Sequence, residues 1–310
     1  MKKIWFFICT IQALACGYAS ASCTKMDYIK STVPDFKIVV QRDVPIGTKI
    51  GSVTFTPAST EVIKCNTGTT YYEMKYQGAT PTSISNVYET NIEGVGVSIS
   101  QPSFNRFWTN PATTTSRSVI NIVFSVNTEV AFYKTGNITS GNIGAGLAVQ
   151  SYGDDRVPAF EIYFATGSIT QVACSIKTPS LVFPIGDVPT SAFGSSVGTI
   201  PTNANKTQNL GLDCDPEANV NVTLTGTQNP DVSTQSVLAL TGQGDEGVAK
   251  GVGVQLLYGG TPLELDKRIV LKKSSGGLES FPIMARYYQT KTSVTPGSAN
   301  TSATLTLTYQ

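Results

Sequence analysis

The final segment Thr301-Ser302-Ala303-Thr304-Leu305-Thr306-Leu307-Thr308-Tyr309-Gln310 alternates apolar and polar residues. Its apolar side chains, at positions 303, 305, 307 and 309, fall on one face of an extended chain, which is typical of a half-buried strand. A strand at a sheet edge leaves N–H and C=O groups unpaired, so it has to be paired in its own sheet or by another chain. An ordinary last strand inside a closed sandwich stays open as the alternative.

Residues 1–21 have the features of a secretory signal peptide. Two lysines precede an apolar run over 4–15, and small residues just before Ser22 offer a cleavage site. A lipoprotein signal at Cys16 is the alternative, but Ala13 stands where such sites prefer a larger apolar residue. No later apolar run approaches the roughly 18 residues that span a bilayer. We therefore expect a soluble, exported protein.

The cysteines outside this segment form two well-separated groups. Four cysteines allow three pairings. Local bridges, Cys23 with Cys65 and Cys174 with Cys214, fit two sequential domains best. A loop of about forty residues closed in this way contributes ~4 kcal/mol on the chain-entropy model. Export and bridging together indicate an oxidising compartment.

Charge and composition exclude several classes of function. Lys plus Arg number 22 and Asp plus Glu 21, which gives no electrostatic signal for nucleic acid or for an anionic membrane. The chain has no His, so it lacks His-dependent nucleophiles and His metal ligands. With the remaining cysteines bridged, a thiolate nucleophile is excluded as well. We expect no cofactor, no metal and no catalytic residue.

Short β-branched and aromatic runs, separated by Pro, Gly and Asn turns, continue along the whole chain. Examples are residues 119–126 and 160–164, and the pattern repeats in kind after residue 171. No window keeps a helical apolar period for three turns. The sequence therefore predicts an all-β fold of two tandem sandwiches. The small polar stretch 165–170 places the domain boundary between residues 168 and 169.

Several motifs of the second half occur in a fixed order. They are Cys174, Lys206-Thr207-Gln208-Asn209-Leu210 before Cys214, Lys250-Gly251-Val252-Gly253-Val254-Gln255-Leu256, Ala285-Arg286-Tyr287-Tyr288, and Gly297 followed by the last strand with its penultimate Tyr309. Together they resemble the pilin domain of chaperone/usher fimbrial adhesins. The resemblance implies an incomplete immunoglobulin-like pilin domain at 169–310.

The first half resembles an adhesin domain fused in front of that pilin domain. The Cys23 and Cys65 pair and the segment 87–97 are most similar to the type 3 fimbrial adhesins, which are mannose-resistant and associated with collagen and matrix binding. The mannose-specific type 1 adhesins are a more distant match, because they begin with an aromatic residue and carry an acidic pair after the second Cys. The resemblance implies an elongated, β-barrel-like, receptor-binding domain at 22–168.

The resemblance also implies partners. A pilin domain that lacks its last strand leaves an open groove, which a periplasmic pilus chaperone fills before an adjacent pilin subunit donates a strand at the outer-membrane usher. Leu305, Leu307 and Tyr309 would then line the groove side, and basic chaperone residues would bind the Gln310 carboxylate. Because Ser22 leads directly into a folded domain with no donor strand, we expect passage through the periplasm to the fimbrial tip, on the extracellular cell surface.

Candidate ligand-binding residues are aromatic or charged groups in turn-rich stretches of the first half. They are Tyr71, Tyr72, Arg106, Trp108, Tyr152, Asp154, Asp155 and Arg156. Such groups stack on sugar rings or hold an extended peptide, so we expect a host glycan or an extracellular-matrix protein as ligand and no nucleic acid. For the tyrosines and Trp108 the ordinary alternative is a place in the core.

The sequence therefore predicts a fimbrial tip adhesin that attaches bacteria to host or surface ligands. A minor structural pilin subunit without its own receptor is the alternative within the same class. A secreted carbohydrate-active enzyme is the alternative from a different class. That enzyme would depend on Asp154 and Asp155, yet a catalytic carboxylate pair needs a defined separation across its substrate, which adjacent residues in a turn do not provide.

Overall fold

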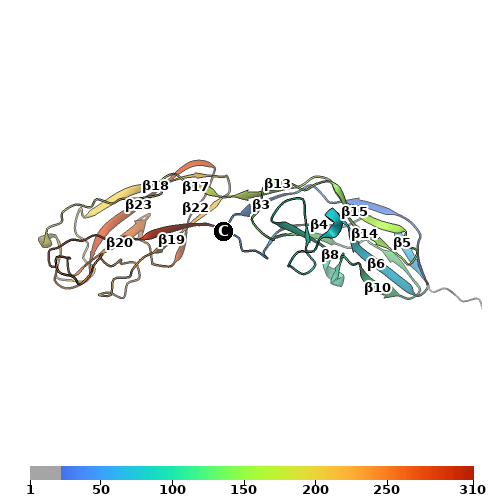
Figure 1. Ribbon diagram of the computed structural model, residues 1–310, viewed down its shortest axis with the longest axis horizontal. Helices are drawn as coiled ribbons and strands as arrows, with labels where there is room; N and C mark the ends of the chain where they lie inside the picture. Colours follow the sequence, from blue (N-terminus) through green and yellow to red (C-terminus); the bar gives the residue numbers. More distant parts are fainter. Residues whose placement is uncertain (1–21) are drawn as a thin grey trace, which may run out of the picture.

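The computed structural model describes residues 22–310, which form two elongated β domains placed end to end (Figure 1). The predicted signal peptide lies outside the described residues. Within this part of the chain the helices are short 3-10 turns: η1 (Tyr76–Ala79), η2 (Pro102–Phe104) and η3 (Thr190–Ala192). No helix of residues 22–310 is long and apolar enough to cross a membrane. The expected all-β fold is confirmed.

The first domain is built from sixteen strands. They are β1 (Cys23–Lys25), β2 (Ile29–Thr32), β3 (Lys37–Gln41), β4 (Lys49–Phe55), β5 (Glu61–Cys65), β6 (Gly68–Met74), β7 (Tyr88–Glu89), β8 (Val95–Gln101), β9 (Arg106–Phe107), β10 (Thr113–Arg117), β11 (Ile120–Val123), β12 (Thr128–Lys134), β13 (Gly141–Asn142), β14 (Gly146–Tyr152), β15 (Pro158–Phe164) and β16 (Ser168–Val172).

The sheets of this domain bring the beginning and the end of its chain together. The strand orders are β1-β5-β11, β10-β6-β14-β15-β2, β4-β12-β8-β7 and β13-β16-β3. Most neighbours are antiparallel, but β2 pairs with β15, and β3 with β16, in parallel. These two pairs close the domain around one core, as expected for a barrel-like sandwich.

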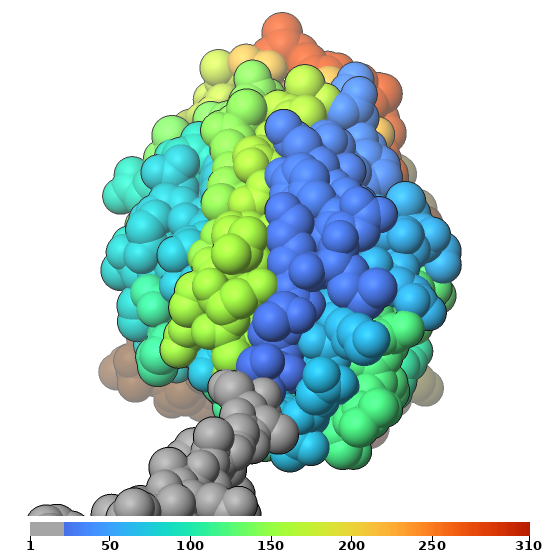
Figure 2. All heavy atoms as spheres, turned by 90° about the vertical axis from the view of Figure 1, so that its right-hand side faces the viewer, coloured from blue at the N-terminus to red at the C-terminus, as the bar shows by residue number. Residues whose placement is uncertain are grey.

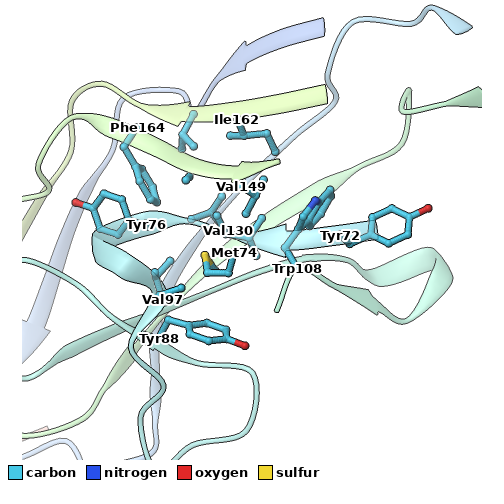
Figure 3. Packing of buried hydrophobic residues seen from close by; sticks show 14 of the residues in the cluster. Tyr72, Met74, Tyr76, Tyr88, Val97, Trp108, Val130, Val149, Ile162 and Phe164 are labelled. Atoms are coloured by element: carbon cyan, nitrogen blue, oxygen red, sulfur yellow. The ribbon is translucent and has the colours of Figure 1, made fainter. Parts of the chain in front are cut away.

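Aromatic side chains fill that core (Figure 3). Phe124 and Phe160 stack with ring centroids 4.2 Å apart, and Trp108 lies 6.0 Å from Phe160. The Trp108 indole N–H donates a hydrogen bond of 2.8 Å to the Ser151 hydroxyl. A buried indole needs such a partner, because an unpaired polar group in an apolar core costs free energy.

The second domain has eight strands in two sheets. The five-stranded sheet runs β17-β18-β23-β20-β21, and the three-stranded sheet runs β22-β19-β24. Their bounds are β17 (Cys174–Ile176), β18 (Asn205–Cys214), β19 (Asn219–Thr225), β20 (Val252–Tyr258), β21 (Thr261–Pro262), β22 (Arg268–Lys273), β23 (Gly277–Gln289) and β24 (Thr304–Tyr309). The predicted last strand is therefore present, and it ends at the junction between the domains (Figure 1).

Each domain contains one disulfide, as the local pairing predicted. Cys23 is bonded to Cys65, and the two residues face each other on β1 and β5. Cys174 is bonded to Cys214, which lie opposite each other on β17 and β18. Both bridges therefore tie the first strand of a domain to a neighbour within the same sheet.

The chain passes from one domain to the other along β16. All five residues of β16 pair with β3, and Ile169 is buried in the core of the first domain. Val172, at the end of this strand, belongs instead to the core of the second domain. We therefore propose a boundary after Val172, a few residues beyond the one expected between residues 168 and 169.

Candidate functional site

The last strand, β24, forms the edge of its sheet. It pairs with β19 on one side only, from Val220 opposite Tyr309 to Thr225 opposite Thr304. Leu305 and Leu307 are half-buried and pack against the core of the second domain, and Tyr309 is 1% exposed. The inward face of β24 is thus the predicted one, while its outer edge is not covered by another strand of residues 22–310.

A cavity of about 1030 Å³ opens next to the segment that leads into β24. Residues 180–190 form one wall and residues 294–303 form the other. The floor consists of apolar side chains from β20 and β23, among them Val254, Leu256 and Ala285. The cavity has the shape of a groove between two segments that do not pair with each other.

The first wall has the pattern of a strand without having a partner strand. Residues 178–189 have no regular secondary structure. Leu181, Phe183 and Ile185 nevertheless pack against the core, whereas Val182 between them is 70% exposed. The Val182 carbonyl accepts from the Gln208 side chain at 2.9 Å, but residues 179–188 pair with no strand of the described chain. A segment with alternating apolar side chains and no partner strand is the condition under which a sheet accepts an added strand. The groove can therefore take an extended peptide with apolar side chains on alternate residues.

The predicted chaperone-binding residues lie next to this groove rather than in its lining. The lining ends at Ala303, before Leu305 and Leu307. The Tyr309 hydroxyl donates to the carbonyl of Cys174 at 3.2 Å, inside the core. The Gln310 carbonyl accepts from the Asn219 side chain at 3.1 Å. Of the predicted chaperone-binding residues, Leu305 and Leu307 have backbone groups on the open edge of β24, where an added strand could form hydrogen bonds with them.

A second candidate site is an aromatic and charged patch on the first domain. Tyr71 on β6 and Tyr152 on β14 are direct neighbours across the sheet, and their rings stack with centroids 5.2 Å apart. The Arg156 guanidinium lies 3.9 Å from the centre of the Tyr71 ring and donates to the Tyr152 hydroxyl at 3.3 Å. Burial raises the pKa of the Tyr152 hydroxyl. Three of the predicted ligand-binding residues therefore form one cluster.

This patch continues across the outer face of the same sheet. Gln150 donates to Glu73 at 2.7 Å, in the row of residues next to the stacked rings. Further along this row the Glu161 carboxylate accepts from the Tyr28 hydroxyl at 2.5 Å and from the Tyr163 hydroxyl at 2.8 Å. These hydrogen bonds raise the pKa of both tyrosines. We call the cluster formed by Tyr28, Tyr71, Glu73, Gln150, Tyr152, Arg156, Glu161 and Tyr163 the tyrosine face. Tyr152 and Glu161 are buried members of it, 7% and 9% exposed, and the other members are exposed or half-buried.

The tyrosine face was only partly visible in the sequence. Its strands β2, β15, β14 and β6 come from distant parts of the chain. In the view of Figure 2, residues 22–40 and 150–165 lie side by side at the end of the first domain. The available signal was the spacing of two residues between Tyr71 and Glu73 and between Glu161 and Tyr163, which puts each pair on one face of a strand. It could not reveal which strands are neighbours.

Asp154 and Asp155 hold the loop that carries Arg156. One Asp154 oxygen accepts from the backbone N–H groups of Cys23 and Thr69, both at 2.9 Å. Asp155 accepts from the Lys25 N–H at 2.6 Å. These carboxylates therefore bind the chain's own backbone, so their role in this structure is to position the loop.

Tyr72, Trp108 and Arg106 lie on the other side of β6. Tyr72 and Trp108 are both 0% exposed, so their prediction as ligand-binding residues is wrong. For Tyr72 the reason is the strand period, because neighbours on β6 point to opposite faces and Tyr71 takes the outward one. Trp108 follows β9 and packs in the core against Phe160, with its indole N–H bonded to Ser151. Arg106 is half-buried, with its guanidinium 4.5 Å from the centre of the Tyr72 ring. It takes no part in the tyrosine face.

A closed β domain followed by an immunoglobulin-like domain with an open groove defines a two-domain pilus subunit. Comparison with known proteins agrees. Residues 36–165 match the family model of the MrkD-like receptor binding domain, and residues 164–310 match that of the fimbrial proteins. This chain therefore combines a MrkD-like receptor-binding domain with a fimbrial-protein domain, which is the two-domain organisation of a chaperone/usher tip adhesin that the sequence resemblance indicated. Members of these families are binding and structural proteins, not enzymes.

Individual relatives are similar over different parts of the chain. A fimbria adhesin protein of Klebsiella pneumoniae is 28% identical, and the match covers 100% of both chains. The solved receptor binding domain of the Klebsiella pneumoniae adhesin MrkD1P is 19% identical over 50% of this chain and 99% of that one, with a TM-score of 0.42. The CupB6 tip adhesin of Pseudomonas aeruginosa is 13% identical over 93% of this chain and 95% of that one, with a TM-score of 0.38.

Proposed function

We propose that this subunit sits at the distal end of a chaperone/usher fimbria and attaches the cell to a host or surface ligand. The open groove next to β24 is the observation that carries the proposal. An apolar groove bordered by an unpaired strand edge exposes the kind of surface that drives aggregation. An extended strand from an adjacent pilin subunit fits this surface, since it supplies both backbone partners and alternating apolar side chains.

Export through the periplasm requires a temporary cover for the same groove. A periplasmic pilus chaperone would cover the groove by inserting one of its own strands. At the outer-membrane usher, the strand of the next subunit would replace the chaperone strand. The first domain supports a position at the distal end of the fimbria, because its strand β1 already has a partner strand within the domain. β1 is paired with β5 and bridged by Cys23 and Cys65, so these residues are not free to complete a neighbour.

The tyrosine face is the proposed ligand-binding surface. The tyrosine rings that remain exposed or half-buried offer apolar contact area, while Arg156, Glu73 and Gln150 supply charged and polar groups beside them. Sugar rings and extended peptides both bind to such a combination. We therefore propose a glycan or an extracellular-matrix protein such as collagen as the ligand. A minor pilin without a receptor is the second candidate, and it predicts no ligand at this face.

Expression of the mature chain with and without a complementing strand tests the proposal. Without a chaperone or added strand, the chain should aggregate or be degraded. A strand peptide from an adjacent pilin should yield a soluble, stable protein, and the same peptide with its apolar positions changed to Asp should not. A stable monomer in the absence of any added strand would contradict the proposal. The strand-completed protein should then bind members of a panel of glycans, collagens and other matrix proteins, and binding to none would support the minor pilin.

A further inference from the structure

The first domain contacts the open edge of β24 at its last residue. The Asp43 N–H donates to the Tyr309 carbonyl at 3.0 Å, and the Tyr309 N–H donates to an Asp43 carboxylate oxygen at 2.9 Å. Tyr309 thus has both backbone groups satisfied by one residue of the other domain. This is the arrangement that a neighbouring strand would provide for a single residue.

Strand geometry places Tyr309 on the same edge as Leu305 and Leu307. Backbone N–H and C=O groups alternate between the two edges of a strand, so residues two apart direct theirs to the same side. The Tyr309 groups point to Asp43, away from β19. The corresponding groups of Leu305 and Leu307 therefore lie on the open edge, and β24 has no second neighbouring strand within residues 22–310.

Further contacts fix the same loop of the first domain, which we call the junction loop (Gln41, Arg42 and Asp43). The Gln41 side chain donates to the Glu217 carbonyl at 2.9 Å and accepts from the Asn219 N–H at 2.8 Å. The Arg42 guanidinium lies 4.6 Å from the centre of the Tyr309 ring. The junction loop therefore holds both β24 and the start of β19.

We propose that the junction loop acts as the final part of the strand that pairs with β24, so that the reach of a partner strand decides whether the two domains stay locked together. A partner strand that pairs only with Leu305 and Leu307 leaves Asp43 in place. One that also pairs with Tyr309 has to displace Asp43 and thereby releases the first domain. This inference rests on the proposed function, since it requires a partner strand on the open edge.

Amide hydrogen exchange on the full mature chain tests this inference. The chain is completed with one of two peptides: a strand from an adjacent pilin that ends beside Leu307, or the same strand extended to pair with Tyr309. With the shorter peptide, the Tyr309 and Asp43 amides should both exchange slowly. With the longer peptide, Tyr309 should remain protected while the Asp43 amide becomes at least about tenfold faster, because it has lost its acceptor.

Variants of Asp43 test the contact between Asp43 and Tyr309, which we call the lock, separately from strand binding in the groove. With the shorter peptide, Asp43→Ala should accelerate exchange at Tyr309 about tenfold and leave Leu305 and Leu307 unchanged. Asp43→Asn keeps an oxygen acceptor and should restore part of the protection. Asp27→Ala, at an acidic residue away from the junction loop, is the matched control and should change none of these amides.

The possible failures have different meanings. If neither peptide slows exchange at Leu305 and Leu307, the proposed strand-acceptor function fails. If these amides are slowed but Tyr309 exchanges equally fast with and without the Asp43 carboxylate, the lock alone is overturned. Retention of the Asp43 amide protection with the longer peptide would also overturn the lock, because the two partners could then pair with β24 at once.

Discussion

At the scale of single residues, the direction of a side chain on β6 decides its role. Tyr71 and Tyr72 are neighbours in sequence, but Tyr71 stacks on Tyr152 on the outer face of the sheet while Tyr72 packs near Trp108 in the core. Arg156 has a positive φ of 59°, a conformation that few residues with a side chain adopt. The hydrogen bonds of Asp154 and Asp155 hold this loop, which brings the guanidinium over the Tyr71 ring.

Truncation of the tyrosine face should weaken ligand binding without loss of the fold. Tyr71→Ala and Arg156→Ala each remove a surface group, and we expect the affinity of the strand-completed protein for its bound glycan or matrix protein to fall at least about tenfold. The measurement is a titration on the immobilised ligand. Phe104→Ala is the control, because Phe104 is 56% exposed and lies outside the face. Equal affinities for all three variants and the parent would remove this face as the site.

Trp108, in contrast, should matter for stability. Trp108→Ala leaves a cavity beside Phe160 and an unpaired Ser151 hydroxyl, so we expect a loss of about 3–5 kcal/mol in the free energy of unfolding of the first domain. Urea denaturation of the strand-completed protein, followed by circular dichroism, measures the change. Phe104→Ala should change the same free energy by less than about 0.5 kcal/mol. A similar small change for Trp108→Ala would mean that this core relaxes around the missing ring.

At the scale of elements, strand type and disulfide pairing followed from local pattern. The alternation at 303–309 gave β24 and its buried face, and the cysteine spacing gave one bridge per domain. The tyrosine face depends instead on the register between β2, β15, β14 and β6, which local pattern does not contain. The boundary that we propose after Val172 rests on similar long-range pairing, because the polar start of β16 pairs with β3 from the beginning of the domain.

The role of Asp154 and Asp155 likewise could not be predicted from local sequence pattern. Gly68 and Gly153 lie so close to β1 that a Cβ on either would meet backbone atoms of Cys23. This close approach is what brings the Asp154 carboxylate to the Cys23 N–H. In sequence the acidic pair and Cys23 are far apart, and only the folded domain makes them neighbours. A pair of acids in a loop is therefore consistent with either ligand binding or backbone anchoring until the strand order is known.

At the scale of the whole molecule, β24 connects the two candidate sites. It borders the groove at one end and meets the junction loop at the other, where the chain terminus lies between the domains (Figure 1). The tyrosine face belongs to the domain on the far side of that junction. Coupling between strand acceptance and the orientation of the first domain can therefore pass through the contacts of the junction loop, among them the contact between Asp43 and Tyr309.

This contact should be insensitive to pH across the physiological range and weaken only in acid. Burial alone would raise the pKa of Asp43, but hydrogen bonds from Arg42 and from the Tyr309 N–H, with the nearby charge of Lys134, outweigh it and lower the pKa. A group whose pKa is lowered by folding contributes stability above its unfolded pKa of about 3.9 and loses it as the pH falls through the folded value. The chain has no His that could titrate near neutrality.

Protection of the Tyr309 amide, corrected for the intrinsic exchange rate, should therefore stay constant from about pH 8 to pH 5 and decline below about pH 4. Small-angle scattering of the strand-completed protein provides a second readout, because release of the lock should broaden the distribution of distances between the domains. The Asp43→Asn variant lacks the titrating group and should show no such acid transition at Tyr309. A transition between pH 7 and pH 5 in the parent protein would mean that a group other than Asp43 controls the junction.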